Sequence, residues 1–445
     1  MQRTLTFRHV MTPAGMVNDC RLRVSPEGLI EALEPDCGEA RDGWLALPGM
    51  PNAHSHVFQR ALAGHGEVPR GNDSFWSWRD AMYRLAQAIT PEDMHVIACQ
   101  AFAEMLAAGY TSLAEFHYLH HGRDGGRGLE MAEAVIEAAE ITGLSLTLLP
   151  VCYLSGGFGT EPLPEQYRFV HASVDEYLGL LDRLKGRVAL GVAPHSLRAV
   201  PLAQLGELVR GAESLLGTDF PFHIHISEQR QEVEQSRETL GVTPIRALAE
   251  HVELSSRWHL VHATHATADE RELMRRADVD VVLCPLTEAY LGDGLFAATE
   301  WCRHGARWSI GSDSNCLIDP VTELRCLEFG QRLGHERRSL LADETGLGRP
   351  LWEQAAQGGA GAVAAPAGSL AIGQRADLVV LDESAAALAG HGPDTVLDAL
   401  VIGGGRHDFA AVYAGGVKLA EHGRHQQAER FRTPFAETAR RLARN

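Results

Sequence analysis

The chain has 445 residues, 45% of them hydrophobic and 22% charged, which is typical of a globular protein with one large domain and an accessory one. Its formal net charge of −18 argues against nucleic acid or an acidic membrane face as a partner. No apolar run approaches the roughly 18 residues of a membrane span, and the N-terminal segment lacks the apolar stretch of a secretory signal. The eight cysteines contain no C-x-x-C pair, so we expect reduced thiols in a cytoplasmic protein.

Short apolar strands alternate with longer helical stretches through most of the chain. The strand candidates are Trp44–Pro51, Tyr110–Glu115, Leu144–Val151, Val188–Pro194, Asp219–Ile226, Trp258–Ala263, Val279–Pro285 and Arg307–Ser312. Helix-patterned segments between them include Pro91–Ala108, Leu129–Thr142, Val174–Leu184 and Pro244–His251. This alternation favours an α/β fold of the (β/α)8 TIM-barrel class, whose site lies at the carboxyl ends of the strands. A doubly wound parallel sheet is the alternative.

The two chain ends do not follow this alternation. Residues before about 47 and after about 365 contain short strands separated by turn residues, and we assign them to one small β-domain. The predicted division is a β-domain of residues 1–47 and 366–425, a barrel of residues 48–365, and a C-terminal helical tail of residues 426–445.

The first chemical pattern is the pair His54 and His56, which follows the first strand candidate. Residues two apart on a strand face the same side, so both imidazoles can reach one ion. An H-x-H pair alone fits a polar strand face equally well. Its position at the carboxyl end of a barrel strand favours a metal site.

A second such pair, His223 and His225, ends the fifth strand candidate, and Glu228 follows three residues later. At that end of the strand His225 can ligate an ion, while Glu228, on the following turn, can act as an acid or base. His223 is one repeat further into the barrel, where a hydrogen-bonded interior histidine is the simpler interpretation.

His262 and Asp313 lie where the sixth and eighth strands should end. His259 falls within its strand and His265 in the following loop, so neither is favoured as a ligand. A strand-end aspartate is often a helix N-cap. However, strand ends that bring four histidines and one aspartate to one face argue for a single metal site.

Three histidines and a carboxylate suit one divalent ion, with zinc as the first choice and iron or manganese as alternatives. The predicted ligands are His54, His56, His225 and Asp313. His262 would then contact a bound water, whose pKa the ion lowers to about 7.

These motifs resemble the amidohydrolase superfamily. The resemblance covers nearly the whole chain and rests on P-G-M-P-N-A-H-S-H, H-I-H-I-S-E, V-H-A-T-H, S-I-G-S-D-S and G-S-L-A-I-G-Q-R-A-D-L-V-V-L-D. It implies a (β/α)8 barrel flanked by a small β-sandwich. Binuclear members place a metal-bridging lysine on strand four, where this chain has Pro194 and His195, with Lys185 before the strand. The resemblance therefore implies one ion and the branch that deaminates amidines and aromatic amines.

Within that branch, the chain resembles the formimidoylglutamate deiminases, which convert N-formimino-L-glutamate to N-formyl-L-glutamate and ammonia in histidine degradation. The stretches concerned are H-S-H-V-F-Q-R-A-L-A-G, F-W-S-W-R-D-A-M-Y-R, E-F-H-Y-L-H-H and A-P-H-S-L-R-A-V. The resemblance implies a homodimer, and substrate contacts from Gln59, Arg79, Tyr118, His195 and Arg198. Arginine also suits the two carboxylates of a glutamate derivative. A surface salt bridge remains the alternative for each arginine, and lid packing the alternative for Tyr118.

The predicted reaction is attack of metal-bound hydroxide on the formimino carbon, with catalytic roles for Glu228, His262 and Asp313. Glu228 would carry a proton to the imine nitrogen, and His262 would take one from water, before ammonia leaves. A deaminase of a purine, a pterin or another aromatic amine is an alternative, favoured by stacking on aromatic residues. Those residues are Phe75, Trp76 and Trp78. A non-catalytic metal-binding barrel is a further alternative, against which an acid/base beside the ligands argues.

Overall fold

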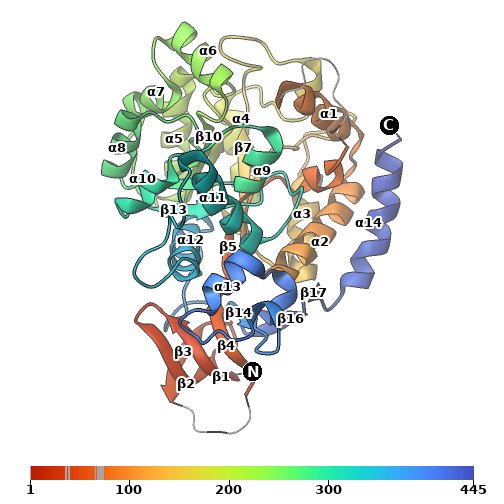
Figure 1. The fold of residues 1–445 in the computed structure, drawn as a ribbon. Helices are drawn as coiled ribbons and strands as arrows, with labels where there is room; N and C mark the ends of the chain where they lie inside the picture. The colour runs from red at the N-terminus through yellow and green to blue at the C-terminus, as the bar shows by residue number, and fades with distance from the viewer. Residues whose placement is uncertain (1, 36–37, 39–40, 66, 68–74, 445) are drawn as a thin grey trace.

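The computed structural model describes residues 2–35, 38, 41–65, 67 and 75–444. The side chains of Phe75 and Trp76 lie outside this description, and so does the predicted stacking by these two residues. Strands from both chain ends form one eight-stranded sheet, ordered β17-β16-β15-β14-β4-β1-β2-β3 (Figure 1). These strands are β1 (Arg3–Thr12), β2 (Gly15–Val24), β3 (Ile30–Pro35), β4 (Gly43–Pro48), β14 (Leu378–Leu381), β15 (Phe409–Ala414), β16 (Val417–Glu421) and β17 (Arg424–His425).

The predicted single strand Trp44–Pro51 is wrong. The chain divides at Gly49 into β4, which pairs with β1 and β14, and β5 (Met50–Ser55), which pairs with β6. A Cβ atom at Gly49 would lie 2.4 Å from Oγ1 of Thr111, so the chain can approach this closely only without a side chain. His54 therefore lies on β5 and His56 directly follows this strand, while β4 belongs to the terminal sheet.

Two parallel sheets hold the remaining strands, β5 to β8 in one and β10 to β13 in the other. Their bounds are β6 (Tyr110–His117), β7 (Ser145–Cys152), β8 (Ala189–Leu190), β9 (Ala193–Pro194), β10 (Phe222–Ile226), β11 (Trp258–His262), β12 (Asp280–Leu283) and β13 (Trp308–Ile310). The predicted strand Val188–Pro194 is broken into β8 and β9, which both pair with β7. Parallel bridges from Val192 to Phe222 and from Ser55 to Asp313 join the two sheets. The arrangement is α/β and of the TIM-barrel type.

Helices lie between the strands along the chain and cover the outside of the parallel sheets (Figure 1). They are α1 (Phe75–Ala88), α2 (Pro91–Ala107), α3 (Glu130–Thr142), α4 (Val174–Leu184), α5 (Leu202–Leu216), α6 (Arg230–Leu240), α7 (Pro244–His251), α8 (Ala268–Arg276), α9 (Pro285–Leu291), α10 (Ala298–Arg303), α11 (Pro320–His335), α12 (Gly348–Ala362), α13 (Val396–Gly403) and α14 (Ala428–Leu442), with short 3-10 turns that include η1 (Val57–Leu62). Capping residues in the sequence mark where helices begin and end. A capping box of Thr90 and Asp93 opens α2, and a left-handed Gly143 closes α3.

The parallel strands are buried on both faces. Every residue of β5, β6, β10, β11 and β12 is buried, as expected for parallel strands covered by helices. Polar side chains at the ends of these strands are therefore withdrawn from water and need partners. None of the described helices is both long and apolar enough to cross a bilayer.

Candidate metal centre and active site

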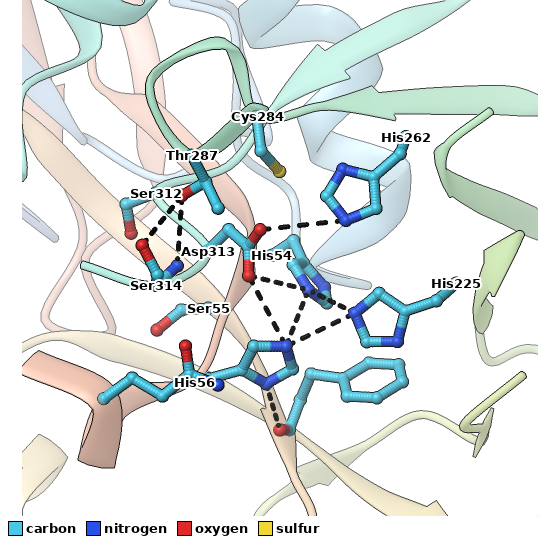
Figure 2. A network of polar contacts seen from close by, with 12 residues as sticks. His54, Ser55, His56, His225, His262, Cys284, Thr287, Ser312, Asp313 and Ser314 are labelled. Atoms are coloured by element: carbon cyan, nitrogen blue, oxygen red, sulfur yellow. Dashed lines mark hydrogen bonds and ion pairs between the residues drawn. The ribbon is translucent and has the colours of Figure 1, made fainter. Parts of the chain in front are cut away.

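Three imidazoles converge where β5 and β10 end (Figure 2). Nε2 of His54 lies 3.2 Å from Nε2 of His56 and 3.1 Å from Nε2 of His225, and the last two atoms are 3.3 Å apart. Nitrogen ligands at the corners of a tetrahedral zinc site are separated by roughly 3.4 Å, given Zn–N bonds of about 2.0–2.1 Å. The three nitrogens are thus spaced like ligands of one tetrahedral ion.

The tautomers of two of these histidines require a cation. Nδ1 of His56 lies 3.0 Å from the carbonyl oxygen of Phe116, and Nδ1 of His225 lies 3.1 Å from that of His195. Because a carbonyl only accepts, each Nδ1 carries the proton and each Nε2 presents a lone pair. Two lone pairs 3.3 Å apart repel each other unless a positive ion lies between them. The donor set therefore fits a metal ion, with backbone carbonyls orienting its imidazoles.

Burial keeps these ligands uncharged. Desolvation lowers the pKa of His56 to about 3, and it lowers the pKa values of His54 and His225 well below the ordinary range. The neutral imidazole is the form that binds a metal, so no proton has to be displaced at neutral pH.

Asp313, after β13, lies beside these imidazoles. Its Oδ1 lies 3.6 Å from Nε2 of His54 and 3.5 Å from Nε2 of His56. Its backbone N–H donates to the carbonyl oxygen of His54 over 2.9 Å, and its own carbonyl oxygen accepts the N–H of His56 over 2.8 Å. The helix N-cap alternative does not hold, because the cap of α11 is Asp319.

A buried polar network fixes β5 against the segment after β13, and sequence reasoning missed it. Nδ2 of Asn52 donates to Oγ of Ser312 over 2.7 Å, and the backbone N–H of Ser312 donates to Oδ1 of Asn52 over 3.1 Å. Nδ2 of Asn315 donates to Oγ of Ser55 and to the carbonyl oxygen of His56. The available signal was sequence position: Asn52 lies within the first histidine motif and Asn315 directly follows the Asp313 motif. A buried amide at either position needs hydrogen-bond partners.

His262 lies among carboxylates. Its Nε2 is 3.7 Å from Oδ2 of Asp313 and 3.8 Å from Oε1 of Glu228, while its Nδ1 is 3.3 Å from Oε1 of Glu288. Burial alone would lower the pKa of His262, but the three carboxylates outweigh burial and raise it to about 10. Glu288 was not predicted. The signal for it was an acidic residue one helical turn beyond the end of the seventh strand.

Arg198 adds a buried positive charge beside Glu228. Its guanidinium lies 3.7 Å from Oε2 of Glu228, with only 11% of the side chain exposed. Although burial acts against the cation, Glu232 and Glu228 raise the pKa of Arg198. Glu232 also accepts the backbone N–H of Glu228 over 2.9 Å, which fixes the turn that carries the predicted acid/base. Arg198 is therefore not a surface salt bridge.

A cavity adjoins these candidate ligands. The predicted site residues that line it are His56, Gln59, Arg79, Tyr118, His195, Arg198, His225, Glu228, His262 and Asp313. Nε2 of Gln59 donates to Oη of Tyr118 over 2.8 Å, and the guanidinium of Arg79 lies 5.4 Å from the ring centre of Tyr83. The lining also contains apolar and aromatic residues that sequence reasoning did not assign to it: Met82, Tyr83, Tyr153, Phe169 and Leu291.

Residues set aside in the sequence lie elsewhere. Nε2 of His223 lies 3.1 Å from the carbonyl oxygen of Ala362, and Nδ1 of His259 lies 3.1 Å from Oδ2 of Asp280. Both histidines are interior, as predicted. Lys185 is exposed and donates to the backbone carbonyl of Leu215 in the last turn of α5, and it does not line the cavity.

Comparison with known proteins agrees with this geometry. Residues 45–406 match the model of the amidohydrolase family. The chain is 43% identical over 442 residues to formimidoylglutamate deiminase of Pseudomonas aeruginosa, covering 96% of each protein. It is 27% identical over 404 residues to 5-methylthioadenosine/S-adenosylhomocysteine deaminase of Halalkalibacterium halodurans, covering 88% of this chain and 85% of that protein. Among solved structures, an amidohydrolase from Brucella melitensis superposes with a TM-score of 0.92 at 38% identity, covering 99% of each chain.

Proposed function

The chain is an enzyme of the amidohydrolase family, and we propose that it hydrolyses N-formimino-L-glutamate to N-formyl-L-glutamate and ammonia, in histidine degradation. The observation that carries this proposal is the buried Arg198, which lines the same cavity as His56 and His225. A fixed cation beside the reacting centre suits a substrate that carries carboxylates, which a neutral heterocycle does not offer. The 43% identity to a formimidoylglutamate deiminase supports the same substrate.

One divalent ion, with zinc preferred, would be held by His54, His56, His225 and Asp313, whose spacing and lone pairs support this assignment. When bound, the ion would lower the pKa of a coordinated water to about 7 and, as a nearby positive charge, would oppose protonation of His262.

The protein's own groups then move the protons. Nε2 of His262 accepts a proton from the attacking water, and Glu228, Glu288 and Asp313 stabilise the resulting imidazolium. Glu228 carries a proton to the imine nitrogen of the substrate. As the tetrahedral carbon collapses, its hydroxyl group gives up a proton to that nitrogen, which leaves as ammonia, and the C–N bond to the glutamate nitrogen is kept.

Substrate binding is assigned to Arg198, Arg79, Gln59, Tyr118 and His195. Arg198 and Arg79 would each take a carboxylate through their planar forks. Gln59 and Tyr118 form one hydrogen-bonded unit at the cavity wall, which supports a role in orienting the formimino group. The ring of His195 lies edge-on to Tyr118 at 5.8 Å, on the same wall.

A deaminase of a purine, a pterin or another aromatic amine is the second candidate, supported by aromatic side chains along the cavity and by the 27% identical nucleoside deaminase. Trp78 is among these lining residues. Membership of a family of hydrolytic enzymes sets aside the non-catalytic barrel.

The direct test is ammonia release by the zinc-loaded protein, measured with N-formimino-L-glutamate, guanine, cytosine and 5-methylthioadenosine as separate substrates. We expect release from N-formimino-L-glutamate alone, with N-formyl-L-glutamate as the second product. Release from a heterocycle, with none from N-formimino-L-glutamate, would replace this function with the second candidate.

We also infer that the parallel sheets close into a (β/α)8 barrel of residues 48–365, supported by the bridges that join them at both edges. The β-domain of residues 1–47 and 366–425 would be a sandwich, supported by one hydrophobic cluster that includes Leu22 and Leu378. Residues 426–445 would be a helical tail, which agrees with α14. A homodimer is proposed from the resemblance, and a cytoplasmic location from the free thiols of the described cysteines.

A further inference from the structure

A second group of donor atoms lies beside the first ligand set. Side-chain donor atoms of His262, Cys284 and Asp313 all lie within 4.8 Å of one another, and all three residues are buried. The thiol of Cys284 points toward the gap between the carboxylate of Asp313 and the ring of His262 (Figure 2). These donors come from the ends of three neighbouring strands, β11, β12 and β13.

The two carboxylate oxygens of Asp313 face different donors. Oδ1 faces His54 and His56, at 3.6 and 3.5 Å, while Oδ2 lies 3.7 Å from Nε2 of His262. The last distance is within a few tenths of an ångström of the roughly 3.4 Å edge of a tetrahedral site. A carboxylate placed in this way can bind one ion on each oxygen, as carboxylates do where two metals lie side by side.

The imidazole of His262 is already oriented for a ligand. Its Nδ1 donates to Oε1 of Glu288 over 3.3 Å, so Nε2 is turned toward Asp313 and offers its lone pair there once its own proton is released. A carboxylate that accepts from the far nitrogen of a ligating histidine is the usual outer support of a metal site.

The surrounding charge favours a cation. Burial raises the pKa of the Cys284 thiol, and the carboxylates of Asp313, Glu288, Glu323 and Glu228 act in the same direction. A thiolate is unfavourable among these negative charges unless a positive ion accompanies it, and a metal ion that binds sulfur supplies that charge.

We propose that Nε2 of His262, Sγ of Cys284 and Oδ2 of Asp313 form a second, inhibitory site for a soft divalent ion, such as Cd²⁺ or Zn²⁺ in excess. Sulfur selects soft ions over Mn²⁺ and Mg²⁺. Binding releases to solvent the thiol proton and any proton held on Nε2 of His262, and it forms a metal–sulfur bond. Because the ion takes the Nε2 lone pair of His262, it stops turnover. That consequence rests on the proposed function, whereas the site itself does not.

The test starts from the full chain loaded with one equivalent of zinc and titrated with Cd²⁺. We expect elemental mass spectrometry to detect a second bound metal equivalent, and ultraviolet spectroscopy to detect the absorption of a cadmium–thiolate bond. Ammonia release should be lost in parallel. Mn²⁺ should produce neither the second equivalent nor the absorption. Cys284→Ser should keep the first equivalent and lose both the second and the absorption. Cys302→Ser, which alters a half-buried thiol on α10, should behave like the unaltered protein.

Binding of only one equivalent by the unaltered protein overturns the site, as does a second equivalent that persists in Cys284→Ser. If that variant does not fold, as judged by circular dichroism, His262→Asn serves instead and must lose the second equivalent while keeping the first. A second equivalent that binds without inhibition supports the site and contradicts the proton-accepting role of His262.

Discussion

Oε1 of Glu288 lies 3.3 Å from Nδ1 of His262 and also accepts the backbone N–H of Cys284 over 2.9 Å. One carboxylate oxygen thus links the turn after β12 to the imidazole at the end of β11. This contact turns Nε2 of His262 toward Glu228 and Asp313, where the proposed reaction takes place.

Glu288→Ala should therefore lower kcat by about 10- to 100-fold, because the imidazole loses its fixed orientation. KM and bound metal should change little, since Glu288 does not itself line the cavity and is not one of the four proposed metal ligands. Glu288→Gln keeps an oxygen that can accept both N–H groups and should restore most of kcat. Equal losses in the two variants would show that the negative charge, and not the contact, is what matters.

Glu228→Gln should reduce kcat by roughly 10²- to 10⁴-fold, the usual contribution of a positioned acid or base. The amide keeps the size of the side chain but cannot carry a proton. Metal content, measured by atomic absorption, should remain at one equivalent. Glu234→Gln, an exposed position on α6, is the matched control and should retain full activity. Full activity in Glu228→Gln would remove this residue from the mechanism.

Arg198→Lys tests carboxylate recognition, since lysine keeps the charge but loses the planar fork. We expect KM for N-formimino-L-glutamate to rise about tenfold, equivalent to roughly 1.4 kcal/mol of binding, with a smaller effect on kcat. Arg187→Lys, at an exposed ion pair with Glu133, is the control and should leave both constants unchanged. Steady-state kinetics with N-formimino-L-glutamate give KM and kcat for both variants. An unaltered KM in Arg198→Lys would argue against a substrate carboxylate at this position.

Gly311→Ala should weaken metal binding through the backbone. An added Cβ would lie 2.7 Å from the carbonyl oxygen of His54 and 2.8 Å from its backbone nitrogen, so β5 would have to move. Overpacking of this kind costs about 1–3 kcal/mol of unfolding free energy. We expect a lower Tm and a higher Kd for zinc. Gly179→Ala on α4, where an added Cβ meets nothing within 4 Å, should leave zinc affinity unchanged.

His171 should contribute to acid sensitivity. Burial lowers its pKa to about 3, against about 6.5 when unfolded. Between these values the unfolded chain binds one more proton than the folded one. The stabilisation is therefore fully present above pH 6.5 and is lost as pH falls toward 3, by up to about 1.4 kcal/mol per pH unit.

His171→Phe should remove that one-proton slope in the same pH window, measured by urea unfolding of the metal-free protein at a series of pH values. His335→Phe, at an exposed position ending α11, should keep the slope. Identical slopes in His171→Phe and the unaltered chain would show that His171 does not contribute to the acid sensitivity.

The sequence alone predicted the ligand histidines correctly as neighbours, because a strand's period of two places His54 and His56 on one side and barrel strands end at one face. It also separated His223 and His259 from them, since both fall earlier in their strands. The same local reasoning failed at Gly49. The apolar run there continues across two different sheets, and nothing in hydrophobic pattern alone marks where one sheet ends.

Contacts between distant segments were decided only by the tertiary structure. His54 and His225 are 171 positions apart, and the 3.1 Å between their nitrogens depends on how β5 and β10 pack. The hydrogen bond between Glu288 and His262 likewise connects the ends of separate strands. So does the proximity of the Cys284 thiol to the carboxylate of Asp313. Periodicity fixes which way a side chain faces. Its distance from a side chain on another strand is fixed by close packing of the whole interior.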